Sequence, residues 1–272
     1  MTYFGFLAIF IGIPLLVLTG LLILARQRQY EMPERFRGWP AWLAVVTLIV
    51  IAFTYTTPWD NYLVATGVWW YDPDLVTGII WGWVPIEEYT FFVVQTLLGG
   101  LWLLVLFRFW PPADSYPPLD GRWRVWSTAV VLLLWVGSII LLASGWRPGT
   151  YLGLELVWAL PPIAIQLAFG ADILWRHGRY VLPSIAILTV YLSATDALAI
   201  SSGTWTIDPE QSVGIYLGGV LPIEEFIFFF LTVTLVIGGI TLLLAQESHE
   251  RFDAFWQHRF GQISNPIRRV SL

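Results

Sequence analysis

Seven long apolar segments constrain the fold of this 272-residue chain more than any other feature. A helix needs about 20 apolar residues to cross ~30 Å of hydrocarbon, and its backbone hydrogen bonds are then all satisfied internally. The chain is 57% hydrophobic and 12% charged, without a long polar stretch for a soluble domain. We therefore predict an all-α integral membrane protein with seven transmembrane helices. The segments are 2–25, 39–57, 78–107, 126–144, 151–174, 181–202 and 218–245.

The arginines predict how these helices are oriented. Thirteen of the 14 arginines fall in the first, third and fifth connections and in the C-terminal tail, and Arg147 alone falls on the other side. Because cytoplasmic loops are enriched in positive charge, we expect an N-terminus outside the cell membrane and a cytoplasmic C-terminus. The first segment lacks the charged start and cleavage site of a signal peptide, so we expect it to be retained. Lysine is absent, which excludes a retinal Schiff base.

A tetrapeptide inside the apolar segments occurs twice. Pro-Ile-Glu-Glu occupies 85–88 and again 222–225, and Asp60 and Asp196 precede the two copies by 25 and 26 residues, which differ by one inserted residue. Further matches extend the repeat: Gly67 with Gly203, Trp69 with Trp205, Asp72 with Asp208, Gly78 with Gly214, and Phe91-Phe92 with Phe228-Phe229.

The repeat predicts a 3+1+3 architecture. Helices one to three correspond to helices five to seven, and the fourth helix links them. Since partner helices are an even number apart, the two three-helix repeats should be parallel and related by an axis along the membrane normal. We place the first repeat at 1–108, the linker with its helix at 109–147, the second repeat at 148–247 and a cytoplasmic tail at 248–272.

The topology gathers carboxyl groups at the outer ends of the helices. Charged groups are costly inside a membrane, so they should face the bundle interior, where burial favours their protonated form and suits them to proton transfer. The alternative is an ordinary helix start, with proline first and acids in the first turn. The catalytic candidates are Asp60, Glu87, Glu88, Asp196, Glu224 and Glu225, and unpaired Glu155 lies nearby.

Aromatic residues accompany both tetrapeptides. They lie one turn after the glutamates, where an aromatic wall could stabilise a carbocation. The substrate-binding candidates are Phe91, Phe92, Phe228, Phe229, Pro85 and Pro222. The three histidines, at 177, 249 and 258, are not placed for an intramembrane metal site, so we predict no metal.

Two three-helix units, each with an aspartate in its second helix and Pro-x-Glu-Glu opening its third, resemble the membrane lycopene cyclases of some bacteria, archaea and fungi. The chain is similar to the fused form of a unit that also occurs as separate subunits. The resemblance covers residues 1–245 and implies lycopene β-cyclase activity in carotenoid biosynthesis, closing the acyclic ends of lycopene into β-ionone rings.

The resemblance also implies a mechanism and partners. A protonated glutamate would donate to C2 of the terminal double bond, the C5–C6 double bond would attack the C1 cation, and a carboxylate would remove the C6 proton. An apolar cavity would protect the cation from water. The expected partners are lycopene, the lipid bilayer and other carotenoid-pathway enzymes, and no nucleic acid. The sequence has no GxGxxG motif, so we expect no flavin and no other cofactor.

Three alternatives stay open from the residues. A proton-coupled transporter could share the 3+1+3 arrangement, with Pro14 and the Pro161-Pro162 pair as hinges. A polyprenyl transferase is disfavoured, since Asp60 and Asp196 stand alone rather than in Asp-rich magnesium motifs. A carotenoid hydratase would share the substrate and the first cation but admit water.

Overall fold

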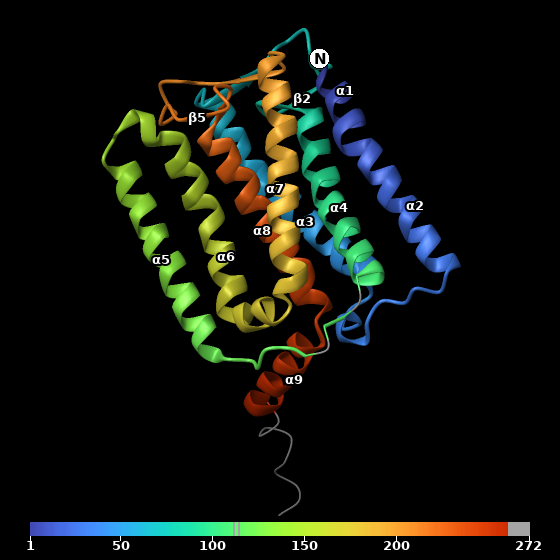
Figure 1. The fold of residues 1–272 in the computed structure, drawn as a ribbon. Coiled ribbons are helices and arrows are strands. Elements are labelled where there is room, and N and C mark those ends of the chain that lie inside the picture. The colour runs from blue at the N-terminus through green and yellow to red at the C-terminus, as the bar shows by residue number, and fades with distance from the viewer. Residues whose placement is uncertain (111, 114, 261–272) are drawn as a thin grey trace, which may run out of the picture.

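The computed structural model describes residues 1–110, 112–113 and 115–260, and long helices running side by side dominate it (Figure 1). Within these residues seven segments are long and apolar enough to cross a membrane, which confirms the predicted number. The helices within them are α1 (Tyr3–Leu7), α2 (Ile13–Gln27), α3 (Ala41–Ala65), α4 (Ile86–Phe109), α5 (Gly121–Ala143), α6 (Thr150–Arg176), α7 (Gly178–Ser201) and α8 (Ile223–Leu244). A π-helical turn, Ala8–Gly12, joins α1 to α2, so the two form one span.

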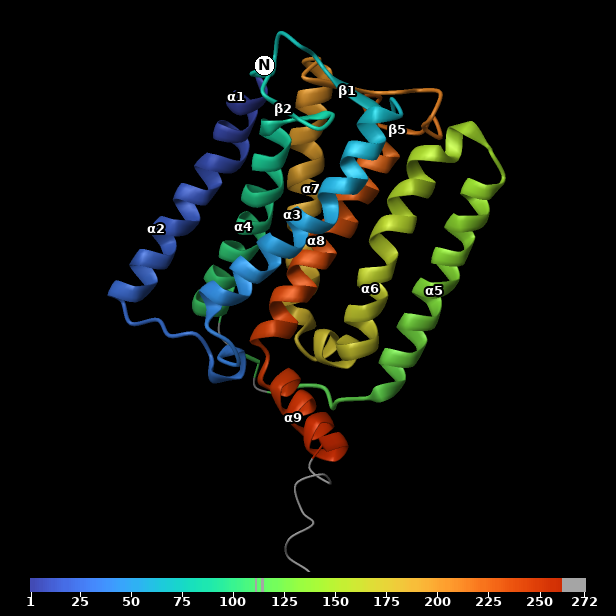
Figure 2. The ribbon, with the colours of Figure 1, turned by 180° about the vertical axis from the view of Figure 1, so that it is seen from behind.

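Helices α4 and α8, which begin at the two tetrapeptides, form the centre of the bundle. Most of their residues are buried, whereas α5 lies at the edge and packs mainly on α6 (Figure 1). Gln95 of α4 donates a hydrogen bond to the Thr232 hydroxyl of α8 at 3.0 Å. A Cβ on Gly99 would lie 2.8 Å from a methyl group of Val236, so glycine permits the close approach of the two helices. Figure 2, which views the bundle from behind, shows α3 crossing it obliquely.

Side chains from other helices cap the carbonyls that intramembrane prolines leave free. A proline at position i cannot bond the carbonyl at i−4. For Pro14 this is the carbonyl of Phe10, which accepts a hydrogen bond from Tyr191 at 2.7 Å. For Pro162 it is the carbonyl of Trp158, which accepts from Tyr55 at 2.8 Å. For Pro161 it is the carbonyl of Val157, which accepts from the indole of Trp135 at 3.2 Å. These three proline sites are thus locked by contacts between helices.

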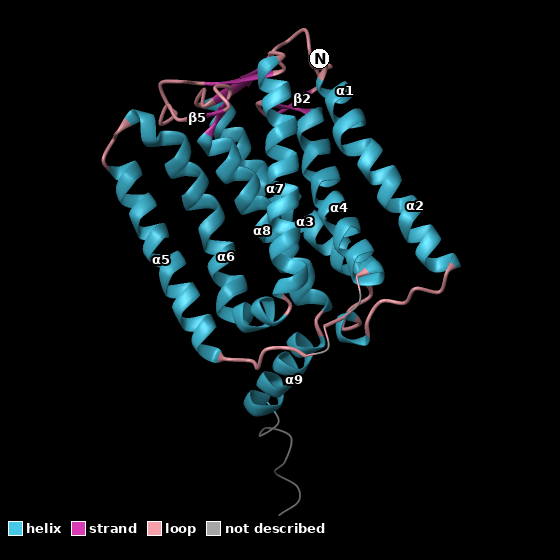
Figure 3. Ribbon diagram, in the orientation of Figure 1, coloured by secondary structure: helices cyan, strands magenta, loops and turns pink. Residues whose placement is uncertain are grey.

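Short strands gather at the end of the bundle that holds the N-terminus (Figure 3). Strand β1 (Trp69–Tyr71) pairs antiparallel with β4 (Trp205–Ile207), with Trp70 opposite Thr206. Two hairpins lie beside this ribbon, formed by β2 (Ile80–Trp81) with β3 (Val84–Pro85) and by β5 (Tyr216–Leu217) with β6 (Leu221–Pro222).

These hairpins correct two predicted helix starts. The third and seventh helices were expected from residues 78 and 218, but α4 begins at Ile86 and α8 at Ile223. The apolar residues before them form strands because Gly78, Gly82 and Gly218 adopt positive φ angles that turn the chain out of a helix. The fold is therefore mostly helical rather than purely so.

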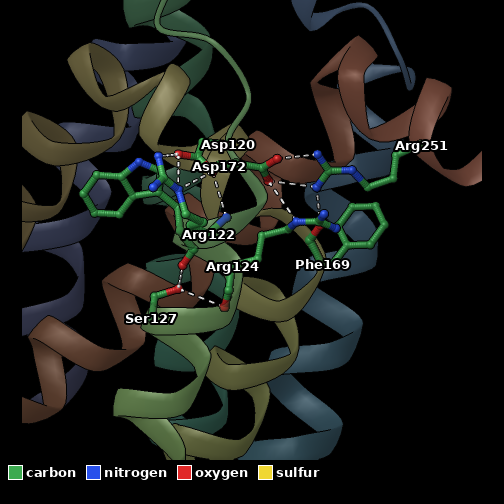
Figure 4. Close-up of polar contacts among 8 residues, drawn as sticks. Asp120, Arg122, Arg124, Ser127, Phe169, Asp172 and Arg251 are labelled. Atoms are coloured by element: carbon green, nitrogen blue, oxygen red, sulfur yellow. Dashed lines mark hydrogen bonds and ion pairs between the residues drawn. The ribbon is translucent and has the colours of Figure 1, made fainter.

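The predicted tail contains a further helix, α9 (Gln246–Phe260), at the opposite end of the bundle from the N-terminus. Figure 4 shows how it is anchored: Arg251 of α9 contacts both carboxylate oxygens of buried Asp172, at 2.9 and 2.6 Å. Arg124 of α5 lies 3.8 Å from the same carboxylate. Glu247 pairs with Arg176 at 3.1 Å and with the His177 ring at 3.3 Å. The rest of the predicted tail, 261–272, lies outside the described residues.

Candidate active site

A small cavity of about 50 Å³ lies beneath the β1–β4 ribbon, lined by residues from both halves of the chain. Four carboxyl side chains reach it from four helices. They are Asp60 of α3, Glu88 of α4, Asp196 of α7 and Glu225 of α8, and each is at most 9% exposed. The structure thus brings four of the six predicted catalytic residues into one shared cavity.

Two tyrosines hold Glu88. This residue lies in the first turn of α4, where Tyr3 of α1 and Tyr71 of β1 both donate hydrogen bonds to its Oε2. The bond from Tyr71 is 3.0 Å long. Burial and the nearby carboxyls of Glu88 and Asp60 raise the pKa of Tyr71 well above its usual value of 10. Tyr71 therefore keeps its proton and serves as a donor.

Glu225 is held in a corresponding way by one tyrosine. Tyr151, in the first turn of α6, donates a hydrogen bond to Glu225 Oε1 at 2.7 Å. The backbone shows the same correspondence: the Tyr3 amide donates to the Leu75 carbonyl at 2.8 Å and the Tyr151 amide to the Gln211 carbonyl at 3.0 Å. Each tyrosine is thus fixed at the start of its helix by the loop that precedes the corresponding tetrapeptide.

The two aspartates differ in their partners. Asp196 Oδ1 accepts a hydrogen bond from the indole of Trp205 at 3.0 Å. Neither carboxyl oxygen of Asp60 has a hydrogen-bond partner among the described residues, although both are buried. The indole of Trp69, which matches Trp205 in the repeat, donates instead to the Tyr71 hydroxyl at 3.1 Å. An unpartnered buried carboxyl is costly unless it is protonated or meets a ligand, so Asp60 is available for chemistry in the cavity.

Glu87 and Glu224 do not line the cavity. Glu87 Oε1 accepts a hydrogen bond from the Thr77 amide at 2.6 Å. Glu224 accepts from the Val213 amide at 2.7 Å and from the Ser212 hydroxyl. Both therefore fasten the loops that precede their helices. Glu155 is fully buried without a hydrogen-bond partner among the described residues, and it lines neither this cavity nor the larger one described below.

Aromatic rings form the remaining walls. All four predicted phenylalanines line the cavity: Phe91, Phe92, Phe228 and Phe229. Trp59 stacks on Phe228 at 5.9 Å between ring centroids, with 7° between the planes. Pro85 and Pro222 lie outside the lining; each precedes the first residue of its helix and pairs in a hairpin. Stacked rings beside carboxyls provide a surface that attracts a cation.

Sequence reasoning missed several residues of the site. The three tyrosines that hold the glutamates were not predicted, and neither were the indoles of Trp59, Trp69 and Trp205. The match of Trp69 with Trp205 in the repeat was a usable signal, because it marks one indole in each half at corresponding positions before the two tetrapeptides. Tyr3 and Tyr151 also occupy corresponding places in the two halves. They are 148 positions apart, whereas the aspartates are 136 and the glutamates 137 positions apart, so matching the halves at the latter offsets does not pair these tyrosines.

Comparison with known proteins identifies the family of the chain. The lycopene cyclase family model matches residues 1–107 and 148–243. The chain belongs to the lycopene cyclase family. The matched ranges contain every carboxyl side chain of the cavity and leave out α5.

Named relatives agree with this assignment. The chain is 39% identical over 242 residues to the lycopene beta-cyclase of Halobacterium salinarum, covering 89% of this chain and 95% of the relative. It is 36% identical over 207 residues to the bifunctional lycopene cyclase/phytoene synthase of Podospora anserina, covering 74% of this chain and 35% of that longer protein. No solved structure matches the chain.

Proposed function

We propose that this protein is a lycopene β-cyclase that acts in the shared cavity. The observation that carries the proposal is the meeting of Asp60, Glu88, Asp196 and Glu225 in one buried, aromatic-walled space. Family membership and the 39% identity to the Halobacterium salinarum cyclase support the same substrate and reaction. The reaction is an isomerisation, so its proton must be both supplied and recovered within the site.

The cavity carboxyls would supply and recover that proton. A protonated carboxyl adds its proton to C2 of the terminal C1–C2 double bond, which leaves a cation at C1. The electron pair of the C5–C6 double bond then forms the C1–C6 bond and closes the ring. A carboxylate removes the proton from C6, so that the C5–C6 double bond re-forms as in a β-ionone ring and no net proton is consumed.

Each half offers a candidate acid–base pair. Glu88 with Asp60 and Glu225 with Asp196 occupy matched positions, and tyrosines orient the glutamates. Phe228, backed by Trp59, lies where cation–π attraction would stabilise the C1 cation. Burial also limits the entry of water, which would trap that cation as an alcohol. This favours cyclisation over hydration.

A transporter is less consistent with the geometry. Alternating access requires helices that rock about flexible points, but the carbonyls freed by Pro14, Pro161 and Pro162 are bonded to side chains of other helices. The cavity carboxyls lie at one end of the bundle rather than at mid-depth, where carriers bind their substrates.

We further propose that two parallel three-helix repeats, 1–108 and 148–247, build the site, with α5 in the 109–147 linker and the α9 end facing the cytoplasm. Contacts at matched positions support the repeat: Trp70 pairs with Thr206, and Gln95 bonds Thr232. The excess of arginine in the connections at the α9 end supports a cytoplasmic location for that end and an outer location for the cavity.

Expression in a lycopene-accumulating bacterium, with pigment chromatography, tests the proposed activity. The expected product is β-carotene, with γ-carotene as the intermediate. Glu88→Gln and Glu225→Gln, made singly, should each lower cyclisation at least 100-fold, because a carboxamide cannot exchange the proton. Glu87→Gln and Glu224→Gln should retain activity in the folded fraction. Unchanged lycopene from a folded, membrane-inserted protein would exclude the proposal, and equal activity in all four variants would exclude the catalytic role of the cavity glutamates.

A further inference from the structure

A second, larger cavity extends from the aromatic wall of the first toward the α9 end of the bundle. It has a volume of about 850 Å³ and lies among α3, α4, α6 and α8. Phe92 and Phe228 line both cavities, so these two rings form the boundary between them. The acid cavity, at about 50 Å³, is too small for a whole carotenoid, whereas 850 Å³ is typical of sites that bind whole organic ligands.

The larger cavity opens sideways between α3 and α6. Ile51 of α3 and Ile165 of α6 line it and are 52% and 70% exposed. Both helices belong to segments that can span a membrane, so this opening faces the hydrocarbon region rather than water. A lipophilic molecule could enter from the bilayer without crossing an aqueous phase. We call this space the lateral groove.

Four polar side chains in the middle of the lateral groove have partners within the protein, whereas Trp158 Nε1 and Ser248 Oγ in the same lining have none among the described residues. Gln95 donates to the Thr232 hydroxyl at 3.0 Å, and Gln166 donates to the Leu235 carbonyl at 2.9 Å. The Thr96 hydroxyl donates to the Phe92 carbonyl one turn earlier in α4 at 2.9 Å. A ligand that hydrogen-bonds to these four side chains would have to break their contacts, whereas a hydrocarbon leaves them intact. The lining therefore favours an apolar occupant.

The groove is long, and α9 closes its far end. Its lining extends along α8 from Phe228 to Leu243, about 22 Å at 1.5 Å per residue. Ser248 and Phe252 of α9 form the end wall. The contact of Arg251 with Asp172 holds α9 in this place (Figure 4). This shape fits a long linear chain better than a compact molecule.

We propose that the lateral groove binds the linear polyene chain of an acyclic carotenoid, with one end group passing Phe92 and Phe228 into the acid cavity. This inference rests on the proposed function and adds the place where the rest of the substrate lies. It explains how a cavity too small for the whole substrate can act on it, because only the reacting end group needs to enter. After one end has cyclised, the molecule leaves sideways and returns with its other end forward.

The test measures retained substrate rather than turnover. Glu88→Gln/Glu225→Gln protein, purified as the full chain from lycopene-accumulating cells, should carry bound lycopene, quantified from its absorbance per mole of protein. Adding Ala52→Trp, which fills the groove from α3, should lower the retained lycopene at least tenfold. Val50→Trp is the matched control: it lies on the same helix, is 55% exposed and is not part of the lining. It should leave retention unchanged.

The outcomes separate the two proposals. Equal retention by the Ala52→Trp and Val50→Trp proteins would overturn the groove even if the wild-type protein cyclises lycopene. Loss of retention with Ala52→Trp alone would support the groove even if the wild-type protein failed to cyclise lycopene. Thermal unfolding in detergent monitors folding of each variant. If Ala52→Trp does not insert, Thr47→Phe, another position in the lining, replaces it with the same expected loss.

Discussion

Tyr151 donates a hydrogen bond to Glu225 at 2.7 Å, and this contact ties the start of α6 to the start of α8. Tyr3 makes the corresponding contact with Glu88, but Glu88 also accepts from Tyr71. The two glutamates therefore have unequal support. Hydrogen bonds to a carboxylate are worth about 1.5–3 kcal/mol, so this inequality should be measurable in the reaction rate.

Removing the hydroxyl of Tyr151 should lower activity more than removing that of Tyr3. Tyr151→Phe leaves Glu225 without its tyrosine donor, so we expect cyclisation to fall about 10- to 100-fold. Tyr3→Phe leaves Tyr71 in place and should cost less. Tyr62→Phe, on an exposed position of α3, is the control. Initial rates of product formation in membranes measure the effect, and equal rates for all three variants would contradict the orienting role of the tyrosines.

Glu224 should contribute to stability through its loop contacts. Glu224→Ala leaves the Val213 amide and the Ser212 hydroxyl without their acceptor, and unpaired buried groups cost about 1–3 kcal/mol each. We expect a lower melting temperature in detergent. Glu210→Ala removes an exposed ion pair with Arg147 and should have a much smaller effect. Equal melting temperatures for the two variants would show that Glu224 does not anchor the loop.

Gly99 should be required for the contact between α4 and α8. The Cβ of Gly99→Ala would lie 2.8 Å from a methyl group of Val236, and overpacking costs about 1–3 kcal/mol, which exceeds the gain of up to ~1 kcal/mol in helix propensity. Gly137→Ala, on exposed α5, adds a Cβ that meets nothing within 4 Å beyond its chain neighbours and its own helix backbone, so it should keep that gain and stabilise the protein. Opposite shifts in melting temperature are expected, and a stabilising Gly99→Ala would contradict the packing described here.

The docking of α9 should depend on pH. Partial burial acts to raise the pKa of Glu247, but the hydrogen bond with His177 and the charges of His177 and Arg176 outweigh it, so this pKa lies below its usual 4.5. A carboxyl whose pKa is lower in the folded than in the unfolded state stabilises the fold at pH values above its unfolded-state pKa. This stability is lost as the pH falls through the folded-state pKa. The hydrogen-exchange protection of α9, taken relative to the intrinsic exchange rate at each pH, should therefore stay high at pH 7 and fall as the pH drops below 4.5. In Glu247→Gln the protection of α9 should be lower at pH 7 and lose most of its pH dependence; an unchanged profile would contradict the prediction.

Much of the fold followed from local pattern. The seven spans were visible because each is a continuous apolar run, and crossing a membrane demands such runs. Helix starts were less accurate: the apolar residues at 79–81 satisfy a helix pattern, but positive φ at Gly78 and Gly82 turns them into a hairpin. Hydrophobicity alone cannot distinguish a helix from a hairpin here, because the same apolar side chains would lie at the membrane interface in either structure.

By itself the sequence determined the family, the number of membrane spans and the set of acids from which the site is built, because motifs and apolar runs are local properties of the chain. Helix geometry adds that two adjacent glutamates cannot point in one direction, since successive helical residues point about 100° apart. Only the tertiary structure decided that Glu88 and Glu225 face one shared cavity while Glu87 and Glu224 bind loops. The physical reason is that the rotation of α4 and α8 about their axes is set by packing between helices, at contacts such as Gly99 with Val236.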